Sequence, residues 1–194
     1  MGVMLTDALW LLDPMFRVLL TFAGGRYGGL IVSSVVADGM RLAARLGHPR
    51  ASSAHVLCAL LETDKQIHRA DGASQRPDIV RRTNTAGDVL ERYGLTSQRL
   101  ILAAADQSIE PAIAFRRRAF FTGRPGARYW SENADVACSV AVQLARTLNH
   151  RMAGTSHLLV GCLDNPTGPA SRMLNSLDVD PVHVLTVQRR RLFS

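Results

Sequence analysis

Hydrophobic residues recur every three or four positions along most of the chain, the spacing of helices that bury one face. Two stretches begin with the same apolar stripe, whose members are Val36, Met40, Ala43 and Leu46 in one and Cys138, Val142, Ala145 and Leu148 in the other. In each, a short polar loop leads to a second helix, HVLCALLE or HLLVGCLD, which is apolar almost all round and is therefore expected at the buried centre. Ser53 or Thr155 is expected to N-cap this helix. A third helix follows around Leu90 or Leu174, ends at Gly94 or Asp178, and gives way to a fourth after Thr96 or Asp180. This pattern predicts an all-α fold.

The two stretches read as copies of one unit. Leu42–Leu61 aligns with Leu144–Leu163 without a gap, at an offset of 102 residues. The identical positions are Leu42, Ala43, Leu46, His48, Ala51, His55, Leu57 and Leu61, which align with Leu144, Ala145, Leu148, His150, Ala153, His157, Leu159 and Leu163. A matched His-x6-His framework inside matched apolar spacing indicates a duplication. We predict two four-helix repeats, residues 31–105 and 130–194, packed on each other as one pseudo-symmetric domain, 31–194.

The segments outside the repeats differ in composition. Lys65–Arg82 is an insertion in the first copy, and its glycine, serine, proline and charged residues predict a surface loop. Residues 106–129 form a linker that carries Arg116–Arg118 between phenylalanines. Residues 1–30 form an apolar extension with helical spacing at Leu5, Leu9, Leu12, Phe16, Leu19 and Leu20. We expect this extension to dock on the body or to cover the seam between the repeats. The alternatives are that it binds a partner, a second copy or a membrane surface.

The extension is not expected to cross a membrane. Asp7, Asp13, Pro14 and Arg17 interrupt it, so no apolar run approaches the ~20 residues of a membrane span. It also lacks the basic start and the small-residue cleavage site of a signal peptide. The expected location is the cytoplasm.

Charge and cysteine content add little chemistry. The formal net charge of +7 rests almost wholly on arginine, since Lys65 is the only lysine. Such a charge permits acidic partners without demonstrating them. Cys58, Cys138 and Cys162 lie in apolar stretches and form no CxxC or Cys/His metal spacing, so they are predicted to be buried free thiols. Neither a metal nor another cofactor is expected.

Two hypotheses about chemistry arise from the residues alone. His55 and His157, with Ser53, Ser156 or Cys58 nearby, could suggest nucleophilic catalysis, but packed imidazoles bonded to the backbone are the preferred interpretation. His48 and His150 are expected to be solvated or to cap a helix. Arg116–Arg118 and Arg189–Arg191 could bind a nucleic acid, which is the weaker alternative to a solvated linker and a helix end whose dipole favours cations.

Residues 130–192 resemble the Clp N-terminal repeat, which occurs in tandem at the front of the ClpA and ClpC unfoldases. Trp130 and Ser131 stand for the family's aromatic-Thr start, and the run Gly154, Thr155, His157, Leu158, Leu159, Gly161 and Leu163 fits its Gly-Thr-Glu-His-Leu-Leu-x-Gly-Leu-Leu motif. Leu177–Asp180 approximates its Leu-Gly-Val-Asp end, and residues 31–105 show a fainter match. The resemblance implies a non-catalytic module that recognises adaptors, substrate peptides or peptide natural products for a AAA+ unfoldase or its protease.

The resemblance also implies where a ligand would bind. We expect it at the seam between the repeats, at Trp130, Ser131 and Glu132, at the helix start Thr155–Ser156, and at the aligned Ser53 and Ala54. The family's motif has a glutamate that helps hold phosphoarginine, whereas Ala54 and Ser156 offer no carboxylate, so this ligand is not expected here. No GxxxxGK[ST] sequence is present, which predicts a stand-alone adaptor, regulator or decoy without ATPase activity.

Overall fold

The computed structural model describes residues 30–71, 83–106 and 130–194. The first repeat contributes α3 (Leu30–Arg45), α4 (Ser53–Asp71), α6 (Ala86–Arg92) and α7 (Ser97–Ala105). The second contributes α8 (Glu132–Thr147), α9 (Thr155–Leu163), α10 (Pro169–Ser176) and α11 (Pro181–Phe193). In these ranges the extended backbone is limited to an isolated bridge between Ala51 and Trp130, so the predicted all-α fold is confirmed. The N-terminal extension up to residue 29 and the linker arginines Arg116–Arg118 lie outside the described residues.

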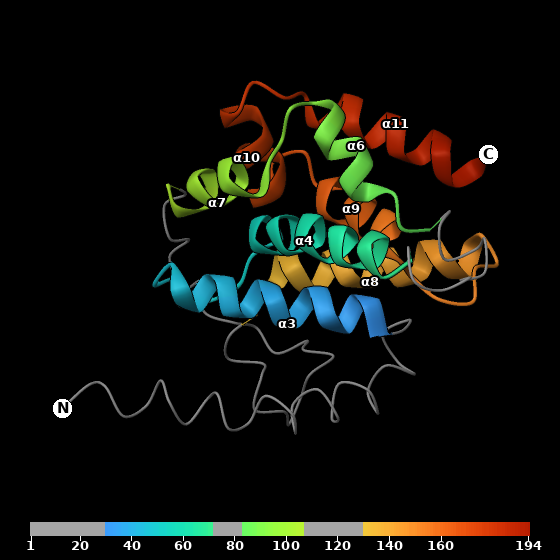
Figure 1. The fold of residues 1–194 in the computed structure, drawn as a ribbon, viewed down its shortest axis with the longest axis horizontal. Coiled ribbons are helices and arrows are strands. Elements are labelled where there is room, and N and C mark those ends of the chain that lie inside the picture. Colours follow the sequence, from blue (N-terminus) through green and yellow to red (C-terminus); the bar gives the residue numbers. More distant parts are fainter. Residues whose placement is uncertain (1–29, 72–82, 107–129) are drawn as a thin grey trace.

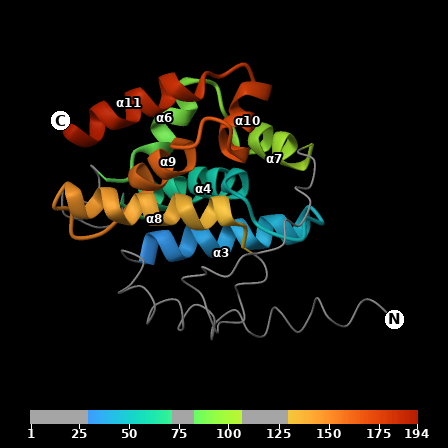
Figure 2. The same cartoon turned by 180° about the vertical axis from the view of Figure 1, so that it is seen from behind.

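The helices form three layers, with α4 and α9 in the middle (Figure 1). The first helices of the repeats, α3 and α8, cover one side of this pair, while α6, α7, α10 and α11 cover the other (Figure 2). Every residue of α9 is buried, and Val56–Leu61 of α4 are equally inaccessible. The prediction that the two all-apolar helices form the centre is therefore confirmed. Burial of their leucines supplies the main hydrophobic stabilisation of the domain.

Aligned positions of the repeats share their turn geometry. The first helix of each ends in a left-handed residue, Gly47 with φ of 73° and Asn149 with φ of 55°. The third helix does the same at Gly94, with φ of 68°, and at Asp178, with φ of 60°. A residue in the left-handed conformation ends a helix and lets the last carbonyls bond to donors outside the regular helix. Glycine and asparagine adopt this conformation at the lowest cost. The duplication thus extends from sequence to backbone conformation.

The insertion differs from its prediction in its first part. Lys65–Asp71 continue α4 as helix instead of entering a loop. No helix breaker occurs before Gly72, and Ile67 is only 8% exposed, so its burial adds to the local helix preference. Residues 72–82 lie outside the described part of the chain.

Candidate functional site at the junction of the repeats

Two histidine pairs occupy equivalent places in the repeats. Nδ1 of His48 lies 2.8 Å from Nε2 of His55, and Nδ1 of His150 lies 2.9 Å from Nε2 of His157. The other ring nitrogen of each inner histidine accepts a backbone N–H three residues upstream, from Ser52 at 3.0 Å and from Gly154 at 3.0 Å. Each inner histidine therefore caps the start of its helix and ties the preceding loop to it. The prediction of backbone-bonded imidazoles is confirmed.

This geometry fixes the protonation of the inner histidines. Since Nδ1 accepts a backbone N–H, it carries no proton, and the single proton of the neutral ring lies on Nε2 and is donated to the outer histidine. Burial, together with a smaller effect of the neighbouring His48 and His150, lowers the pKa of His55 and of His157 to about 4. The outer histidines, expected to be solvated or to cap a helix, are instead half-buried partners of the inner ones.

The nucleophilic hypothesis finds no support in these contacts. Both nitrogens of His55 and His157 are engaged, and neither bonds to Cys58, Ser53 or Ser156. Burial raises the pKa of the Cys58 and Cys138 thiols to about 12, so they stay protonated at neutral pH. A protonated, buried thiol is a poor nucleophile. The three cysteines are free and buried, as predicted.

One side of the junction between the repeats is built around the start of α4. Ser131 donates its N–H to the carbonyl of Ala51 at 2.9 Å, which joins the segment before α8 to the segment before α4. The N–H of Ser53 donates to Oδ1 of Asn133 at 3.0 Å, and Oγ of Ser53 accepts the N–H of Ala170 at 3.2 Å. The first turns of α8 and α10 are thereby both attached to the first turn of α4.

The other side is built around the start of α9. Thr155 donates its hydroxyl to Oδ1 of the buried Asp64 at 2.7 Å and its N–H to Oδ1 of Asn84 at 3.0 Å. Ser156 donates its N–H to the carbonyl of Thr83, and its hydroxyl accepts the N–H of Thr85 at 3.1 Å. Gly154 packs against the same segment, Thr83–Thr85, and an added Cβ would come within 2.3 Å of the Thr83 carbonyl oxygen. The start of α9 is therefore inserted into the first repeat.

These contacts alter the expected roles of the predicted site residues. Ser53 and Thr155 were predicted to N-cap their own helices, but both helices begin at these residues and their hydroxyls bond to the opposite repeat. Trp130 was expected to contact a ligand at the seam, yet its side chain is only 6% exposed. Ser53, Ala54, Thr155 and Ser156 are buried as well, whereas Ser131 is half-buried and Glu132 is exposed. Sequence reasoning missed Asp64, Asn84 and Asn133, because no motif marks a partner so distant along the chain.

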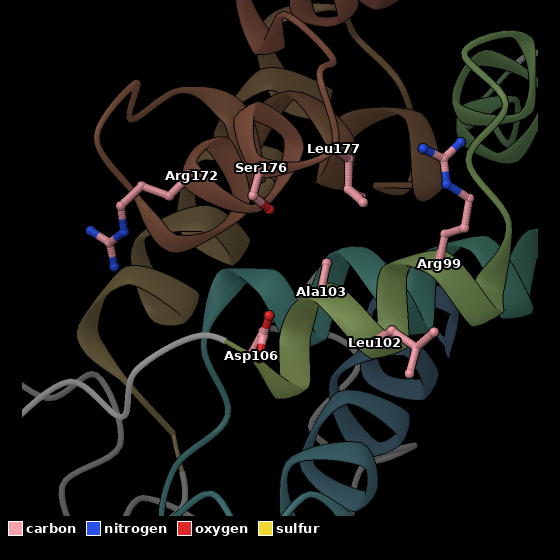
Figure 3. A pocket seen from close by; sticks show the side chains of 7 residues that line it. All are labelled: Arg99, Leu102, Ala103, Asp106, Arg172, Ser176 and Leu177. Carbon is pink, nitrogen blue, oxygen red and sulfur yellow. The ribbon is translucent and has the colours of Figure 1, made fainter.

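A groove of about 540 Å³ lies between α7 and α10, at the same boundary between repeats (Figure 3). We call it the α7–α10 groove, and its lining residues are Arg99, Leu102, Ala103, Asp106, Arg172, Ser176 and Leu177. The sequence did not assign these residues to a binding site, because they become neighbours only when the fourth helix of one repeat meets the third helix of the other. The signal that could have found them is the pairing of helices that a pseudo-twofold arrangement imposes.

The remaining candidate features give little chemistry. Arg189 bonds to Asp164 at 3.0 Å, which neutralises one member of the C-terminal arginine run. Among the described residues, no group of three or more His, Cys, Asp or Glu side chains is placed to hold a metal ion. Within the same ranges, no helix has the length and apolar character that crossing a bilayer requires.

The second helical repeat matches a known protein family. Residues 130–191 match the family model described as Clp repeat (R) N-terminal domain. The matched stretch is the second helical repeat, α8 to α11, and covers about a third of the chain. The resemblance found in the sequence is thus confirmed for the second repeat.

Sequence similarity to subunits of a Clp protease covers a longer part of the chain. The chain is 23% identical over 146 residues to the ATP-dependent Clp protease ATP-binding subunit ClpC of Staphylococcus saprophyticus, a match that covers 75% of this chain. The ClpC of Staphylococcus aureus strain USA300 matches to the same extent. The chain spans 14% of the length of these relatives.

A solved structure shares the fold. The N-terminal domain of the chaperone ClpD from Arabidopsis thaliana superposes with a TM-score of 0.55 at 17% identity. The superposition covers 83% of this chain and 91% of the ClpD domain. The packing of two four-helix repeats is therefore a shared fold, present here with its own side chains at the junction.

Proposed function

We propose that this chain is a non-catalytic binding module of a Clp proteolysis system, which recognises an adaptor, a substrate peptide or a peptide-like ligand. The observation that carries the proposal is the duplicated helical unit whose second copy matches the Clp repeat. The relatives are subunits of an ATP-dependent protease, and the ClpD domain belongs to a protease-associated chaperone. A module of this kind acts as an adaptor, a regulator or a decoy for an unfoldase.

The surface proposed for recognition is the rim formed by Trp130, Ser131 and Glu132. Glu132 is exposed and lies in the first turn of α8, where its carboxylate presents an exposed charge to a partner. Trp130 and Ser131 hold this rim against Ala51 of the first repeat. Ser53, Ala54, Thr155 and Ser156 lie beneath the surface, so their part is to fix the geometry of the rim.

Phosphoarginine is not part of this proposal. Ala54 has no side-chain acceptor, and the hydroxyl of Ser156 is buried and bonded to Thr85. A guanidinium needs a carboxylate to form the charge-assisted hydrogen bonds that hold it. Natural peptides without this modification are the expected ligands.

Affinity purification of the full chain from its own cells, followed by mass spectrometry, tests the proposal. We expect Clp unfoldase, protease or adaptor subunits to be enriched with the unaltered chain and reduced about tenfold with Glu132→Arg, because the charge at the rim is reversed. Asp88→Arg is the matched control, since Asp88 is also an exposed acidic residue in the first turn of a helix.

Absence of every Clp component from the purified material would contradict the proposed function. Equal loss of the partner with Glu132→Arg and Asp88→Arg would contradict the placement of the surface at the rim. Circular dichroism of both variants verifies that each retains its helices.

A further inference from the structure

The two repeats make the same contact twice, with different side chains. The fourth helix of each repeat meets the third helix of the other, which pairs α7 with α10 and α11 with α6. Aligning Leu90 with Leu174 places Arg99 opposite His183 in the alignment, and Tyr93 opposite Leu177. At the α6–α11 contact, Tyr93 and His183 meet edge to face, with ring centroids 5.7 Å apart. At the α7–α10 contact, the same two positions hold Leu177 and Arg99, and the α7–α10 groove lies between the helices.

The α7–α10 groove combines apolar surface with two guanidinium groups. Figure 3 shows Arg99 and Arg172 toward opposite ends, with Ala103, Ser176 and Leu177 between them. Leu102 on α7 adds an apolar side chain that is 65% exposed, which is an unusual exposure for a leucine.

Both guanidinium groups are held in place by the backbone. Arg99 donates from Nη1 to the carbonyl of Gly94 at 2.8 Å, and Arg172 donates from Nη1 to the carbonyl of Thr167 at 2.8 Å. A guanidinium has five N–H donors in a fixed plane, so a bond from one of them to a carbonyl restricts the orientation of the whole group. An oriented guanidinium loses less conformational entropy when it binds a carboxylate.

The positive charges that line the α7–α10 groove favour a negatively charged ligand. Arg99 and Arg172 contribute two positive charges, and Asp106, beside the end of α7, contributes one negative charge. The position aligned with Arg172 is Asp88, and the position aligned with Arg99 is His183, so the other contact lacks this pair of guanidinium groups. The net charge of +7 favours the approach of acidic partners in general.

We propose that the α7–α10 groove binds an acidic peptide segment, with an apolar side chain against Ala103 and Leu177 and carboxylates at Arg99 and Arg172. This rests on the proposed function, because it names the chemistry of a ligand for the same module. The groove lies close to the rim. Ala170, two residues before Arg172, and Asn133, next to Glu132, both bond to Ser53. A peptide seated in the groove thus extends toward the rim.

Fluorescence anisotropy with the full chain tests this proposal directly. The probe is a short fluorescent peptide with glutamates on both sides of a central leucine pair, and its matched control has lysine in place of each glutamate. We expect the acidic peptide to bind, more weakly as salt rises, and the basic peptide to bind at least tenfold more weakly.

Three variants locate the binding. Arg99→Glu should weaken the acidic peptide about tenfold, and Leu177→Tyr should do the same by filling the groove as Tyr93 does in the other contact. Asp106→Asn should tighten binding of the acidic peptide about threefold, because it removes a carboxylate that repels the glutamates of the peptide. A gain in affinity cannot result from unfolding of the variant. Arg151→Glu, an exposed loop substitution with the same change in net charge as Arg99→Glu, should leave binding unchanged.

Unchanged affinity in Arg99→Glu, or an equal loss in Arg151→Glu, would overturn the proposal, since binding would then lie elsewhere or reflect total charge alone. Equal affinity for the acidic and basic peptides would overturn it as well. Peptide binding that meets these expectations would support the α7–α10 groove as a site for acidic peptides. If no Clp component were captured from cells in the same study, the proposed function would be refuted while the groove proposal would stand.

Discussion

At the scale of single residues, the paired histidines show how a motif can look catalytic and be structural. In each repeat the inner ring accepts a backbone N–H at its helix start and donates to the outer ring. Neither inner histidine bonds to Ser53, Ser156 or Cys58, the candidate nucleophiles. A ring held in this way orders the loop that precedes the buried helix, which is why the same spacing recurs in both copies.

The inner histidines predict an acid-sensitive fold. An unfolded histidine titrates near pH 6.5, whereas the pKa of His55 and of His157 is about 4 in the folded state. The unfolded state therefore binds more protons between these values, so stability is fully present above about pH 6.5 and declines as pH falls toward 4. The loss should be about 3 kcal/mol for each histidine.

Urea unfolding across this pH range measures the effect. His157→Asn keeps a side-chain oxygen that can accept the Gly154 N–H and takes up no proton, so its stability should fall roughly half as steeply with acid as that of the unaltered chain. An unfolding free energy that is flat between pH 6.5 and 4 would contradict the assigned tautomers and pKa values.

At the scale of elements, the start of α9 is the part that joins the repeats. Its first residue, Thr155, donates to Asp64, whose other carboxylate oxygen accepts the Gly87 N–H at the start of α6. One buried carboxylate thus links the second helix of one repeat to the second and third helices of the other. Buried carboxylates remain stable only when such donors surround them.

Thr155→Val tests this link by removing one donor from the buried carboxylate while keeping the shape of the side chain. We expect a loss of about 2 kcal/mol in the free energy of unfolding. Thr186→Val is the matched control, because the exposed Thr186 hydroxyl bonds within its own helix to the carbonyl of Val182 at 2.8 Å. Its cost should stay within about 0.5 kcal/mol. Equal costs for the two variants in urea titrations would show that Asp64 does not need the Thr155 hydroxyl.

Elements differ in how far the sequence predicts them. The fourth helices begin where predicted, because Thr96 and Asp180 cap them with their own side chains, a signal contained in a few neighbouring residues. The extension of α4 to Asp71 was not predicted, because burial of Ile67 adds to helix formation beyond the local composition. The hydroxyls of Ser53 and Thr155 were assigned to local capping, yet their partners are 117 and 91 residues away.

At the scale of the whole molecule, duplication explains both what could be predicted and what could not. The matched leucines and histidines reveal two equal units, so the all-α fold and its buried centre follow from the sequence. How the units face each other depends on side chains that differ between them, such as Asp64 in one and Asn133 in the other. The site therefore emerges from contacts between repeats, where no local pattern announces it.

The same asymmetry gives the molecule two unequal faces. The α6–α11 contact carries a ring pair, while the α7–α10 contact carries a groove next to the rim of Trp130, Ser131 and Glu132. Exposed Glu132 at the rim and the guanidinium groups of Arg99 and Arg172 at the groove offer charges of both signs. A partner that matches both signs would be distinguished from one that matches only one.

Amide hydrogen exchange of the full chain, alone and with the Clp component that co-purifies with it, tests the central claim most directly. The account predicts slower exchange on binding at residues 130–135, at the rim, with α3 and the end of α11 unaffected. Slower exchange confined to α3 or to the C-terminal end of α11, with residues 130–135 unchanged, would contradict it.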